Sequence, residues 1–395
     1  MIEHSTNSAP YSKAKSNSHN SIGVTANFND AVQLPLNTLA AQTKHVFVTG
    51  AGGFLGKAIC RLLRLADIKV TGFARGSYPE LTQMGVNMKQ GDITDFSRLK
   101  ETMQSCDLVF HVAAKAGVWG CKDDYFKPNV QGAQNIIRAC QELAITRLVY
   151  TSTPSVTFAG VDEAGIDESQ PYADNFLNFY GESKALAEQL VLAASHDLKH
   201  GLKQGASLDS LQASHQGKSL KTVALRPHLI WGPNDPHLVP RVLERARAGK
   251  LKLVGKEDKL VDTIFVDNAA YAHILAAVAL NEPEATCIGK AYFISNDQPI
   301  TMAAMLNNIL HCVDLPPVTK RVPSTVAYAV GTTLEWFYNV LNIKQEPIMT
   351  RFVARQLSTS HYFDISAAKK DLGYTPLISI EEGMKQLKLS LVGSS

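Results

Sequence analysis

Residues 45–56 read His-Val-Phe-Val-Thr-Gly-Ala-Gly-Gly-Phe-Leu-Gly, and this stretch decides the fold. The apolar run 45–49 predicts a short buried β-strand. It is followed by Gly50, Gly53 and Gly56, a spacing typical of a turn that joins a strand to a helix and holds a phosphate group. The first glycine permits the tight turn, the second lets the phosphate approach the backbone, and the third lets the helix pack close to the sheet.

The helix predicted after this turn completes an anion site. Apolar residues with helical spacing run over residues 54–65, so the turn opens directly into a helix. The first amides of a helix have no partner within it, so those of Phe54 and Leu55 are free to bind a pyrophosphate. Strand, glycine turn and helix together predict a dinucleotide-binding site.

Short apolar runs and helical segments continue to alternate along the chain. This alternation implies right-handed crossovers between parallel strands. The predicted fold class is therefore α/β, with a Rossmann-type doubly wound parallel sheet and a smaller carboxyl-terminal substrate lobe. Further strands are expected at 68–74, 86–90, 107–112, 148–151 and 222–225, with helices at 95–104 and 130–143.

The 395 residues divide into segments of different composition. Residues 1–43 are predicted to form a disordered polar tail, because their first half is rich in Ser and Asn. Residues 44–226 are predicted to form the Rossmann domain, interrupted by a polar inserted surface loop at 195–220. Residues 227–395, where prolines break regular elements, are predicted to form the substrate lobe, with part of 261–295 returning to the Rossmann domain.

Charge and cysteine content exclude several classes of protein. The 39 Lys and Arg nearly balance 36 Asp and Glu, for a net charge of +3, so we expect no nucleic-acid partner. The six cysteines include no C-x-x-C pair, which favours reduced thiols and a cytoplasmic location. His196 and His200 are four residues apart but lack a third ligand at a matching spacing, so no metal site is predicted.

No segment reaches 18 consecutive apolar residues, so we expect no membrane span. The nearest candidate is the segment 326–341, which contains Glu335 and two threonines. Two interpretations stay open for it. It is either a buried helix of the core or an apolar surface that touches lipid or the alkyl chains of a lipidic substrate.

The end of the second strand bears on the choice between NAD and NADP. An acidic residue is expected there when the ribose hydroxyls of NAD are bound, but the chain has Arg75. A guanidinium can pair with the 2′-phosphate of NADP(H), so we favour NADP(H) as the cofactor. Asp92 follows the third strand, where its carboxylate could accept a hydrogen bond from the adenine amino group. The alternative role of Asp92 is a helix cap near Asp95.

Tyr180 and Lys184 are four residues apart, which places them on one face of a predicted helix. A phenol has an ordinary pKa of about 10, and a nearby ammonium lowers that pKa by favouring the phenolate. Such a pair suits proton transfer to or from a carbonyl or alcohol oxygen. The strand before this helix ends in hydroxyl side chains, including Ser152 and Thr153, which can donate to the same oxygen.

Glycine turn, strand-end hydroxyl and Y-x-x-x-K pair together resemble the extended short-chain dehydrogenase/reductase family. Within it, residues 150–153, 226–231 and 262–268 resemble the 3β-hydroxysteroid dehydrogenase/isomerase branch. The likeness is greatest to the bacterial reductases of that branch that act on 2-alkyl-3-oxo acids in long-chain olefin biosynthesis. Further motifs that carry the resemblance are 49–56, Asp92, 111–114, 129–132, 180–184, 226–227 and 232–233.

The resemblance implies Tyr180 as the catalytic acid or base, Lys184 as its pKa tuner and ribose ligand, and Thr153 as the hydroxyl that orients the substrate oxygen. Thr153 is preferred to Ser152 because the family's active hydroxyl is the last of this run, although the family usually has serine there. Cofactor contacts are implied at Gly50, Gly53, Phe54, Leu55, Gly56, Arg75, Asp92, Ile93, Ala113, Lys184 and Pro227.

The resemblance also implies a substrate and partners. The expected reaction is NADPH-dependent reduction of a branched long-chain 3-oxo acid to the corresponding 3-hydroxy acid. A homodimer packed through the helix that carries Tyr180, and contacts with other enzymes of the same hydrocarbon pathway, are implied as well. His228 is expected either to border the nicotinamide or substrate or to be a hydrogen-bonded structural histidine.

Three alternative functions stay open. A 3β-hydroxysteroid or sterol dehydrogenase would use the same residues on a rigid polycycle. A nucleotide-sugar epimerase is less well supported, because the run of residues expected of the related dehydratases is replaced by Thr153-Pro154-Ser155. A non-catalytic dinucleotide sensor would not need the intact tyrosine, lysine and threonine.

Overall fold

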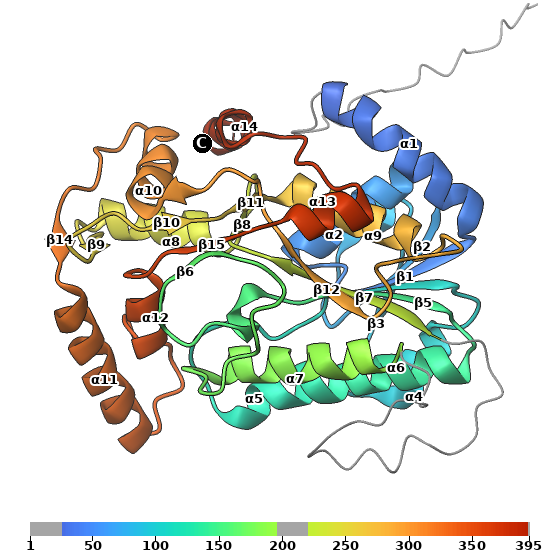
Figure 1. Ribbon diagram of the computed structural model, residues 1–395, viewed down its shortest axis with the longest axis horizontal. Coiled ribbons are helices and arrows are strands. Elements are labelled where there is room, and N and C mark those ends of the chain that lie inside the picture. The colour runs from blue at the N-terminus through green and yellow to red at the C-terminus, as the bar shows by residue number, and fades with distance from the viewer. Residues whose placement is uncertain (1–25, 196–219, 394–395) are drawn as a thin grey trace, which may run out of the picture.

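The computed structural model describes residues 26–195 and 220–393, and Figure 1 shows a central sheet with helices on both faces. Within these residues the sheet has seven strands in the order β12-β7-β5-β4-β1-β2-β3, and all neighbours are parallel. This confirms the predicted Rossmann-type α/β fold. The strands are β1 His45–Thr49, β2 Lys69–Ala74, β3 Asn87–Gln90, β4 Leu108–His111, β5 Arg147–Thr151, β7 Lys221–Pro227 and β12 Lys290–Ile294.

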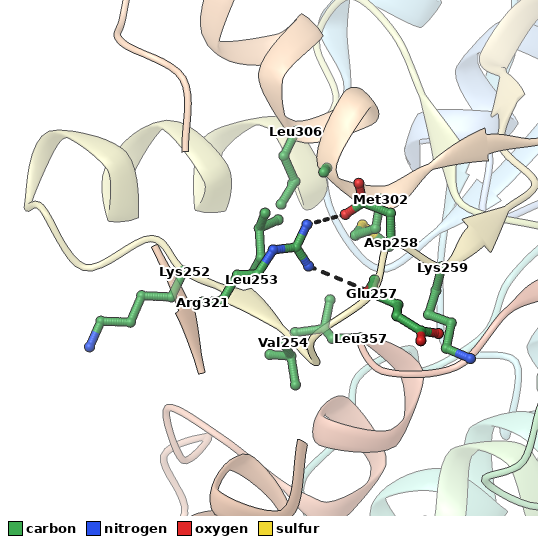
Figure 2. A pocket seen from close by; sticks show the side chains of 11 residues that line it. Lys252, Leu253, Val254, Glu257, Asp258, Lys259, Met302, Leu306, Arg321 and Leu357 are labelled. Carbon is green, nitrogen blue, oxygen red and sulfur yellow. Dashed lines mark hydrogen bonds and ion pairs between the residues drawn. The ribbon is translucent and has the colours of Figure 1, made fainter. Parts of the chain in front are cut away.

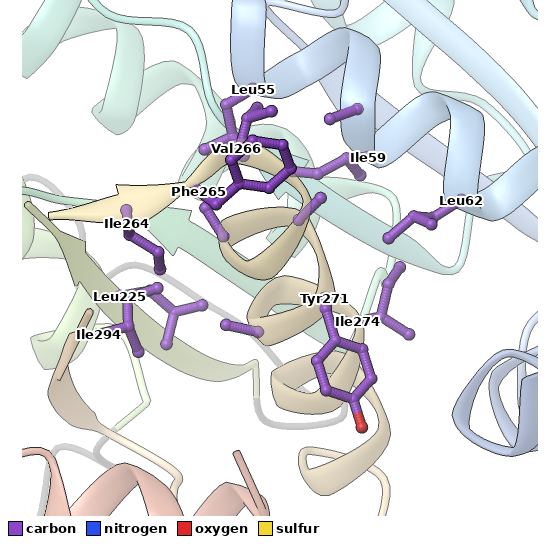
Figure 3. Close-up of a cluster of buried hydrophobic side chains, with 14 of the residues drawn as sticks. Leu55, Ile59, Leu62, Leu225, Ile264, Phe265, Val266, Tyr271, Ile274 and Ile294 are labelled. Carbon is purple, nitrogen blue, oxygen red and sulfur yellow. The ribbon is translucent and has the colours of Figure 1, made fainter. Parts of the chain in front are cut away.

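Each face of the sheet is covered by its own hydrophobic core. In the view of Figure 1, α4, α5, α6 and α7 lie below the sheet and α1, α2, α9 and α13 lie above it. Figure 3 shows the upper core, where side chains of α2 and α9 meet those of β7 and β12. The helices are α1 Ala26–Gln42, α2 Phe54–Leu65, α3 Pro79–Gln83, α4 Phe96–Thr102, α5 Lys122–Phe126, α6 Gly132–Glu142, α7 Phe179–Ala193, α9 Val266–Ala279 and α13 Ser366–Leu372, with a π-helical turn at Lys127–Gln131.

The amino-terminal helix α1 contradicts part of a prediction. The disordered tail predicted over 1–43 is wrong for residues 26–42, which form a helix, while residues 1–25 lie outside the described residues. Its four core residues are each 1% exposed or less and pack with α2 and α9, because they recur every three or four positions on one face of the helix. These residues are Phe28, Val32, Leu36 and Leu39.

The smaller lobe lies at the left of Figure 1. Its main sheet has the order β13-β10-β15-β6, so β6 (Glu163–Ile166) joins this lobe although it lies inside the range predicted for the Rossmann domain. In the opposite direction, α9 and β12 from the segment 261–295 pack within the Rossmann fold. The remaining elements are β8 Ile230–Trp231, α8 Leu238–Arg247, β9 Leu253–Val254, β10 Leu260–Val261, β11 Ile264–Phe265, β13 Ile300–Thr301, α10 Met302–His311, β14 Arg321–Val322, α11 Ser324–Val340, α12 Arg351–Gln356, β15 His361–Phe363 and α14 Ile380–Val392.

Several sequence predictions meet the described residues only in part. The predicted inserted loop 195–220 is described at its two end residues, so His196 and His200 lie outside the described residues. All six cysteines are described, and none of them forms a disulfide. Among the described helices, none is long and apolar enough to cross a bilayer.

The segment 326–341 forms most of α11 and is largely exposed. The buried residues of this helix are Ala327, Gly331 and Glu335, which make a narrow stripe along it. The interpretation of the segment as a plain core helix is therefore wrong, because its larger apolar side chains face away from the protein. Trp336 is 66% exposed and Val340 is 63% exposed.

A buried carboxylic acid lies in the sheet of the smaller lobe. Glu163 is 3% exposed, and within the described residues its Oε1 atom has no hydrogen-bond partner. Burial raises the pKa of Glu163 to about 7, although a hydrogen bond with Thr157 and the charge of Arg226 oppose the shift. The group is therefore held in a site that favours its neutral form.

We expect Glu163→Gln to change how stability depends on pH. The pKa of Glu163 is raised from 4.5 in the unfolded chain to about 7 in the fold, so between these values the folded state binds more protons. Stability should fall as pH rises through this window, by up to about 3 kcal/mol in the free energy of unfolding. The glutamine variant should lack this loss, and urea unfolding at about pH 5 and about pH 8 would measure it. If the stability of the wild type and of the Glu163→Gln variant depends on pH in the same way, the pKa of Glu163 is not raised in the folded state.

Candidate active site

The glycine turn lies between β1 and α2, as predicted. Gly50 has a φ of 64°, a conformation that favours glycine, and its amide donates to the Phe73 carbonyl at 2.9 Å. A Cβ on Gly50 would lie 2.8 Å from the backbone of Ala113. A Cβ on Gly56 would lie 2.1 Å from the Gly50 carbonyl oxygen, so this glycine lets the helix pack against the turn itself.

The start of α2 fits a dinucleotide pyrophosphate. Gly53 is the residue before the helix, and no side chain caps this end. Phe54 and Leu55 are the first two residues of α2, so their amides belong to the first turn, which has no acceptor within the helix. A phosphate bound here would meet amide donors and the positive end of the helix dipole. This cradle without Cβ atoms is the observation that supports a dinucleotide at this site.

Thr49 and His111 fix the position of Ala113 beside the turn. The Thr49 Oγ1 atom accepts the amides of Val112 and Ala113, each at 3.1 Å, and lies 2.8 Å from Nδ1 of His111. Since this oxygen already accepts two hydrogen bonds, its own proton is directed to Nδ1. Burial lowers the pKa of His111 to about 3, with the charge of Lys184 as a second cause, so the ring is neutral.

Arg75 and Asp92 lie at the ends of the second and third strands. Arg75 follows β2 directly and is exposed, and its carbonyl accepts from the side chain of Gln90 at 2.7 Å. Hydrogen bonds from Thr94 to one Asp92 oxygen, at 2.9 and 2.7 Å, lower the pKa of that carboxyl, and the charge of Arg75 lowers it further. The guanidinium of Arg75 is therefore near Asp92 without bonding to it.

The alternative role of Asp92 as a helix cap is wrong. The cap of α4 is Asp95, whose carboxylate accepts the amide of Arg98 at 3.0 Å. Asp92 therefore stays available for the predicted contact with the adenine amino group. Ile93 is buried and contacts Gly132 at the start of α6, so it shapes the wall of this region.

Lys184 is a buried cation on the second turn of α7. Its side chain is 2% exposed, and Nζ donates to the Thr151 carbonyl at 2.6 Å. The same Nζ lies 4.1 Å from the centre of the Tyr150 ring. Burial lowers the pKa of Lys184 to about 7, and the carboxylate of Glu188 opposes this shift. The hydrogen bond to Thr151 therefore holds the amine at the carboxyl end of β5, where burial favours its neutral form.

Tyr180 lies one helical turn before Lys184 and is brought next to Thr153. Burial raises the pKa of Tyr180 and outweighs the opposing hydrogen bond with Thr153, so the lowering expected from Lys184 is not found. The hydroxyl of Ser152 is buried and has no hydrogen-bond partner among the described residues. Of the two neighbouring hydroxyls, Thr153 is thus the one that meets Tyr180. The Tyr125 ring lies 6.5 Å from the Tyr180 ring, between centres.

A buried ion pair behind the tyrosine and lysine was not predicted. Glu188 is fully buried and accepts from the Arg226 guanidinium at 2.5 Å and from the Tyr172 hydroxyl at 2.8 Å. It lies one helical turn after Lys184, so Tyr180, Lys184 and Glu188 follow one face of α7 at intervals of four residues. That spacing was the available signal. The pair ties α7 to β7 and places a negative charge near the lysine.

Pro227 and His228, which follow Arg226, connect the end of β7 to the smaller lobe. Pro227 ends β7 and pairs in register with Ile294 of β12. His228 is buried, and its Nε2 lies 2.6 Å from Nδ1 of His361. Nε2 of His361 lies 2.8 Å from a backbone carbonyl and must donate to it, so its Nδ1 accepts and Nε2 of His228 donates. His228 is thus a hydrogen-bonded histidine that ties the two lobes together.

Asn129 belongs to the motif 129–132, but the sequence assigned it no role. It lies in the π-helical turn, and its side chain exchanges hydrogen bonds with the backbone of Lys115 at 2.7 and 3.1 Å. Its amide also donates to Ser183, next to Lys184, at 2.9 Å. π-Helical turns are frequent at functional sites, and this one fixes the loop after β4 against α7.

A separate small pocket in the other lobe does not belong to this site. Figure 2 shows it beside β9 and β14, with Arg321 turned toward Asp258, with which it forms an ion pair. Its volume is about 20 Å³, enough for roughly one water molecule. None of the predicted site residues lines it.

Relatives of known activity share most of the chain. A 2-alkyl-3-oxoalkanoate reductase of Shewanella oneidensis is 65% identical over 91% of this chain and 89% of its own. A protein of the same name from Stenotrophomonas maltophilia is 46% identical over 87% of this chain and 98% of its own. The human sterol-4-alpha-carboxylate 3-dehydrogenase, decarboxylating, is 33% identical over 87% of both chains.

Solved structures agree on the fold. The NAD complex of UDP-glucose 4-epimerase from Thermus thermophilus superposes with a TM-score of 0.64 at 21% identity, over 89% of this chain and all of that chain. At this identity the likeness concerns the fold alone. The pattern of the 3-beta hydroxysteroid dehydrogenase/isomerase family matches residues 47–320, well over half of the chain. With the glycine turn and the Tyr180–Lys184 pair in place, the chain is an oxidoreductase that belongs to the 3-beta hydroxysteroid dehydrogenase/isomerase family.

Proposed function

We propose that this enzyme reduces a 2-alkyl-3-oxoalkanoate to the 2-alkyl-3-hydroxyalkanoate with NADPH. The observation that carries the proposal is the convergence of Tyr180, Lys184 and Thr153 at the carboxyl end of β5, on the same sheet edge as the glycine turn that follows β1. Two relatives that bear the name of this activity support the substrate class. The same convergence disfavours a purely dinucleotide-sensing protein, which would need no proton donor.

The residues of the chain divide the chemistry as follows. The glycine turn and the start of α2 would hold NADPH, whose chemistry would be to supply the hydride for the ketone carbon. The Tyr180 hydroxyl donates its proton to the ketone oxygen, and Thr153 donates a hydrogen bond to the same oxygen. When charged, Lys184 favours the phenolate left on Tyr180, which then regains a proton from water. One hydride and one proton convert the ketone to the alcohol.

We propose that Arg75 reads the 2′-phosphate of NADP(H). Its exposed guanidinium stands at the end of β2 and forms no ion pair within the described residues. The charge of Arg75 contributes to the lowered pKa of Asp92, so the two side chains interact weakly. A phosphate that binds Arg75 would compete with this weak interaction only.

Replacing Arg75 with glutamate should weaken NADPH far more than NADH. Losing a charge-assisted contact to the phosphate and adding a repelling carboxylate should raise the dissociation constant for NADPH roughly 10- to 100-fold. The constant for NADH should change by less than about threefold, since that cofactor has no such phosphate. Fluorescence titration of both cofactors measures the effect. Equal losses for both would show that Arg75 does not read the phosphate.

The test of the proposed reaction is NADP⁺ reduction with synthetic 2-alkyl-3-hydroxy acids of graded chain length, beside a sterol. The alcohol direction avoids the instability of 3-oxo acids. Oxidation of the branched hydroxy acids, with little or none of the sterol, is the expected result. Oxidation of the sterol, with little or none of the branched hydroxy acids, would identify the enzyme as a sterol dehydrogenase. This is the second candidate function, because the human relative named above is a sterol dehydrogenase.

We also propose a cytoplasmic homodimer that packs through α7 and contacts other enzymes of the same hydrocarbon pathway. Phe179, 39% exposed at the start of α7, supports an interface there. Light scattering after gel filtration would give the mass of the assembly, and a monomer would contradict the dimer.

A further inference from the structure

The exposed side of α11 carries a run of apolar side chains, with Thr333 among them. Six apolar side chains on it, here called the α11 face, are between 42% and 66% exposed. They fall within one side of the helix, because steps of three, four and seven residues return to the same face. The α11 face consists of Val326, Val330, Trp336, Phe337 and Val340 of α11 and of Leu341, the residue that caps its carboxyl end.

The opposite side of α11 fastens the helix to the smaller lobe. Ala327 packs with Val254 of β9 and Ala354 of α12. The Glu335 carboxylate accepts from Arg351 twice, from the backbone amide and from Nε, each at 2.6 Å. The helix is therefore held rigidly by a narrow stripe, and the α11 face is directed outward. Figure 1 shows α11 at the edge of the molecule farthest from α1.

The segments around α11 are strongly basic. Residues 238–259 and 320–356 together contain 12 Lys and Arg against five Asp and Glu, a net charge of +7, whereas the whole chain carries +3. Three of the five acids are already paired, Glu335 with Arg351, Glu346 with Arg241 and Asp258 with Arg321. Figure 2 shows that the side chain of Lys252, one of the residues that line the pocket, extends away from the others. Several of these cations form no ion pair within the described residues: Arg245, Arg247, Lys250, Lys252, Lys256, Lys320, Lys344 and Arg355.

Contacts lead from α11 to the candidate active site. Trp119 packs edge-on against Tyr338 of α11, with 6.0 Å between ring centres, and its Nε1 donates to the Ile343 carbonyl at 3.1 Å. The Trp119 carbonyl accepts from the Tyr125 hydroxyl at 2.8 Å, and the Tyr125 ring faces that of Tyr180. The apolar helix is thus separated from the catalytic tyrosine by two aromatic residues.

We propose that the α11 face and the surrounding cations dock the enzyme on the surface of an anionic lipid bilayer. An exposed apolar helix face with aromatic residues and a basic rim is the chemistry of a helix that lies in the headgroup layer. The basic rim selects anionic lipid over a second copy of this chain, since two such surfaces would repel each other. The proposal rests on the proposed function in one respect: a substrate with two long alkyl chains resides in lipid and would reach Tyr180 from that side.

Vesicle cosedimentation tests the docking without any assay of activity. The full chain should bind vesicles of mixed phosphatidylcholine and phosphatidylglycerol, and should bind phosphatidylcholine alone at least about tenfold more weakly. The double variant Trp336→Gln, Val340→Gln should lose at least about tenfold in partition to the anionic vesicles. The matched control is Leu34→Gln on α1, which removes a similarly exposed leucine (75%) at the other end of the molecule and should bind as the wild type does.

The charge component has its own variant and control. Lys250→Gln with Lys252→Gln should weaken binding to anionic vesicles by about fivefold for each charge, and Lys370→Gln on α13 should not. Binding that ignores lipid charge, or that survives the α11 variant, would overturn the proposal. Light scattering without lipid gives a further test. If the α11 variant forms a smaller assembly than the wild type, the α11 face binds a second copy of the chain, and the proposal is overturned.

A separate assay keeps the two proposals apart. With a short-chain hydroxy acid in solution, the α11 variant should turn over as the wild type does, and with a long-chain acid supplied in vesicles it should be at least about fivefold slower. Failure of both proteins on every hydroxy acid would refute the proposed function while the cosedimentation result still stood. Equal rates on the vesicle-borne acid would refute delivery from the bilayer.

Discussion

Replacing Tyr180 with phenylalanine should lower turnover roughly a thousandfold and leave NADPH binding unchanged. The change removes one hydroxyl, which is the group placed next to Thr153 and one helical turn from Lys184. General acid catalysis contributes about 100- to 10,000-fold to a rate, so its loss should fall within that range. The phenylalanine ring keeps the packing against Tyr125, so the fold should survive. NADPH oxidation at saturating cofactor measures the turnover, and fluorescence titration measures the binding.

Tyr125→Phe is the matched control for this prediction. The same hydroxyl group is removed from a neighbouring ring, where it donates to the Trp119 carbonyl rather than to substrate. Its turnover should stay within about threefold of the wild type, since a neutral hydrogen bond contributes only about 1 kcal/mol. The assignment of Tyr180 fails if Tyr180→Phe retains near-normal turnover or if both variants lose equally.

Glu188→Ala should lower the free energy of unfolding by about 3–5 kcal/mol, the cost of leaving a buried charge unpaired. Arg226 is 4% exposed and would lose the carboxylate that accepts two of its nitrogen donors, and Tyr172 would lose the same acceptor. Since the pair joins α7 to β7, the loss should also loosen the helix that carries Tyr180 and Lys184. Urea unfolding measures the change.

An exposed ion pair gives the comparison for Glu188. Glu80 pairs with Lys57 at 2.7 Å, with about half of each side chain exposed, so Glu80→Ala should change stability by less than about 1 kcal/mol. If Glu188→Ala costs no more than Glu80→Ala, the buried pair does not hold α7 to the sheet.

The predictions that succeeded were carried by short stretches of sequence. The run 45–56 contains strand, turn and helix start within twelve residues, so local geometry alone placed Gly50 and Gly56. Tyr180 and Lys184 share a helix face for the same reason. Interactions across the fold gave no such signal. Glu188 and Arg226 are 38 residues apart, and His228 and His361 are 133 apart, so each pair is defined by the way the elements pack.

The helix α1 shows a different kind of error. Its apolar residues, such as Val32 and Leu36, have helical spacing, but polar residues and Pro35 lie among them. The prediction of a disordered tail over residues 1–43 rested on the composition of the first half of that segment, so this spacing was missed. The stripe is stable as a helix because α2 and α9 bury it. The opposite holds for α11, whose apolar composition predicts a core although its large side chains face outward.

In the reaction that we propose, a hydride moves between NADP(H) and the third carbon of a 2-alkyl-3-oxo acid. The most direct test is isotopic. A 2-alkyl-3-hydroxyalkanoate with deuterium on that carbon is incubated with NADP⁺ and the enzyme, and the cofactor is analysed by mass spectrometry and NMR. We predict one deuterium on the fourth carbon of the nicotinamide for each ketone formed. Ketone formation with unlabelled NADPH, or reduced cofactor without loss of deuterium from the substrate, would contradict the proposed hydride transfer.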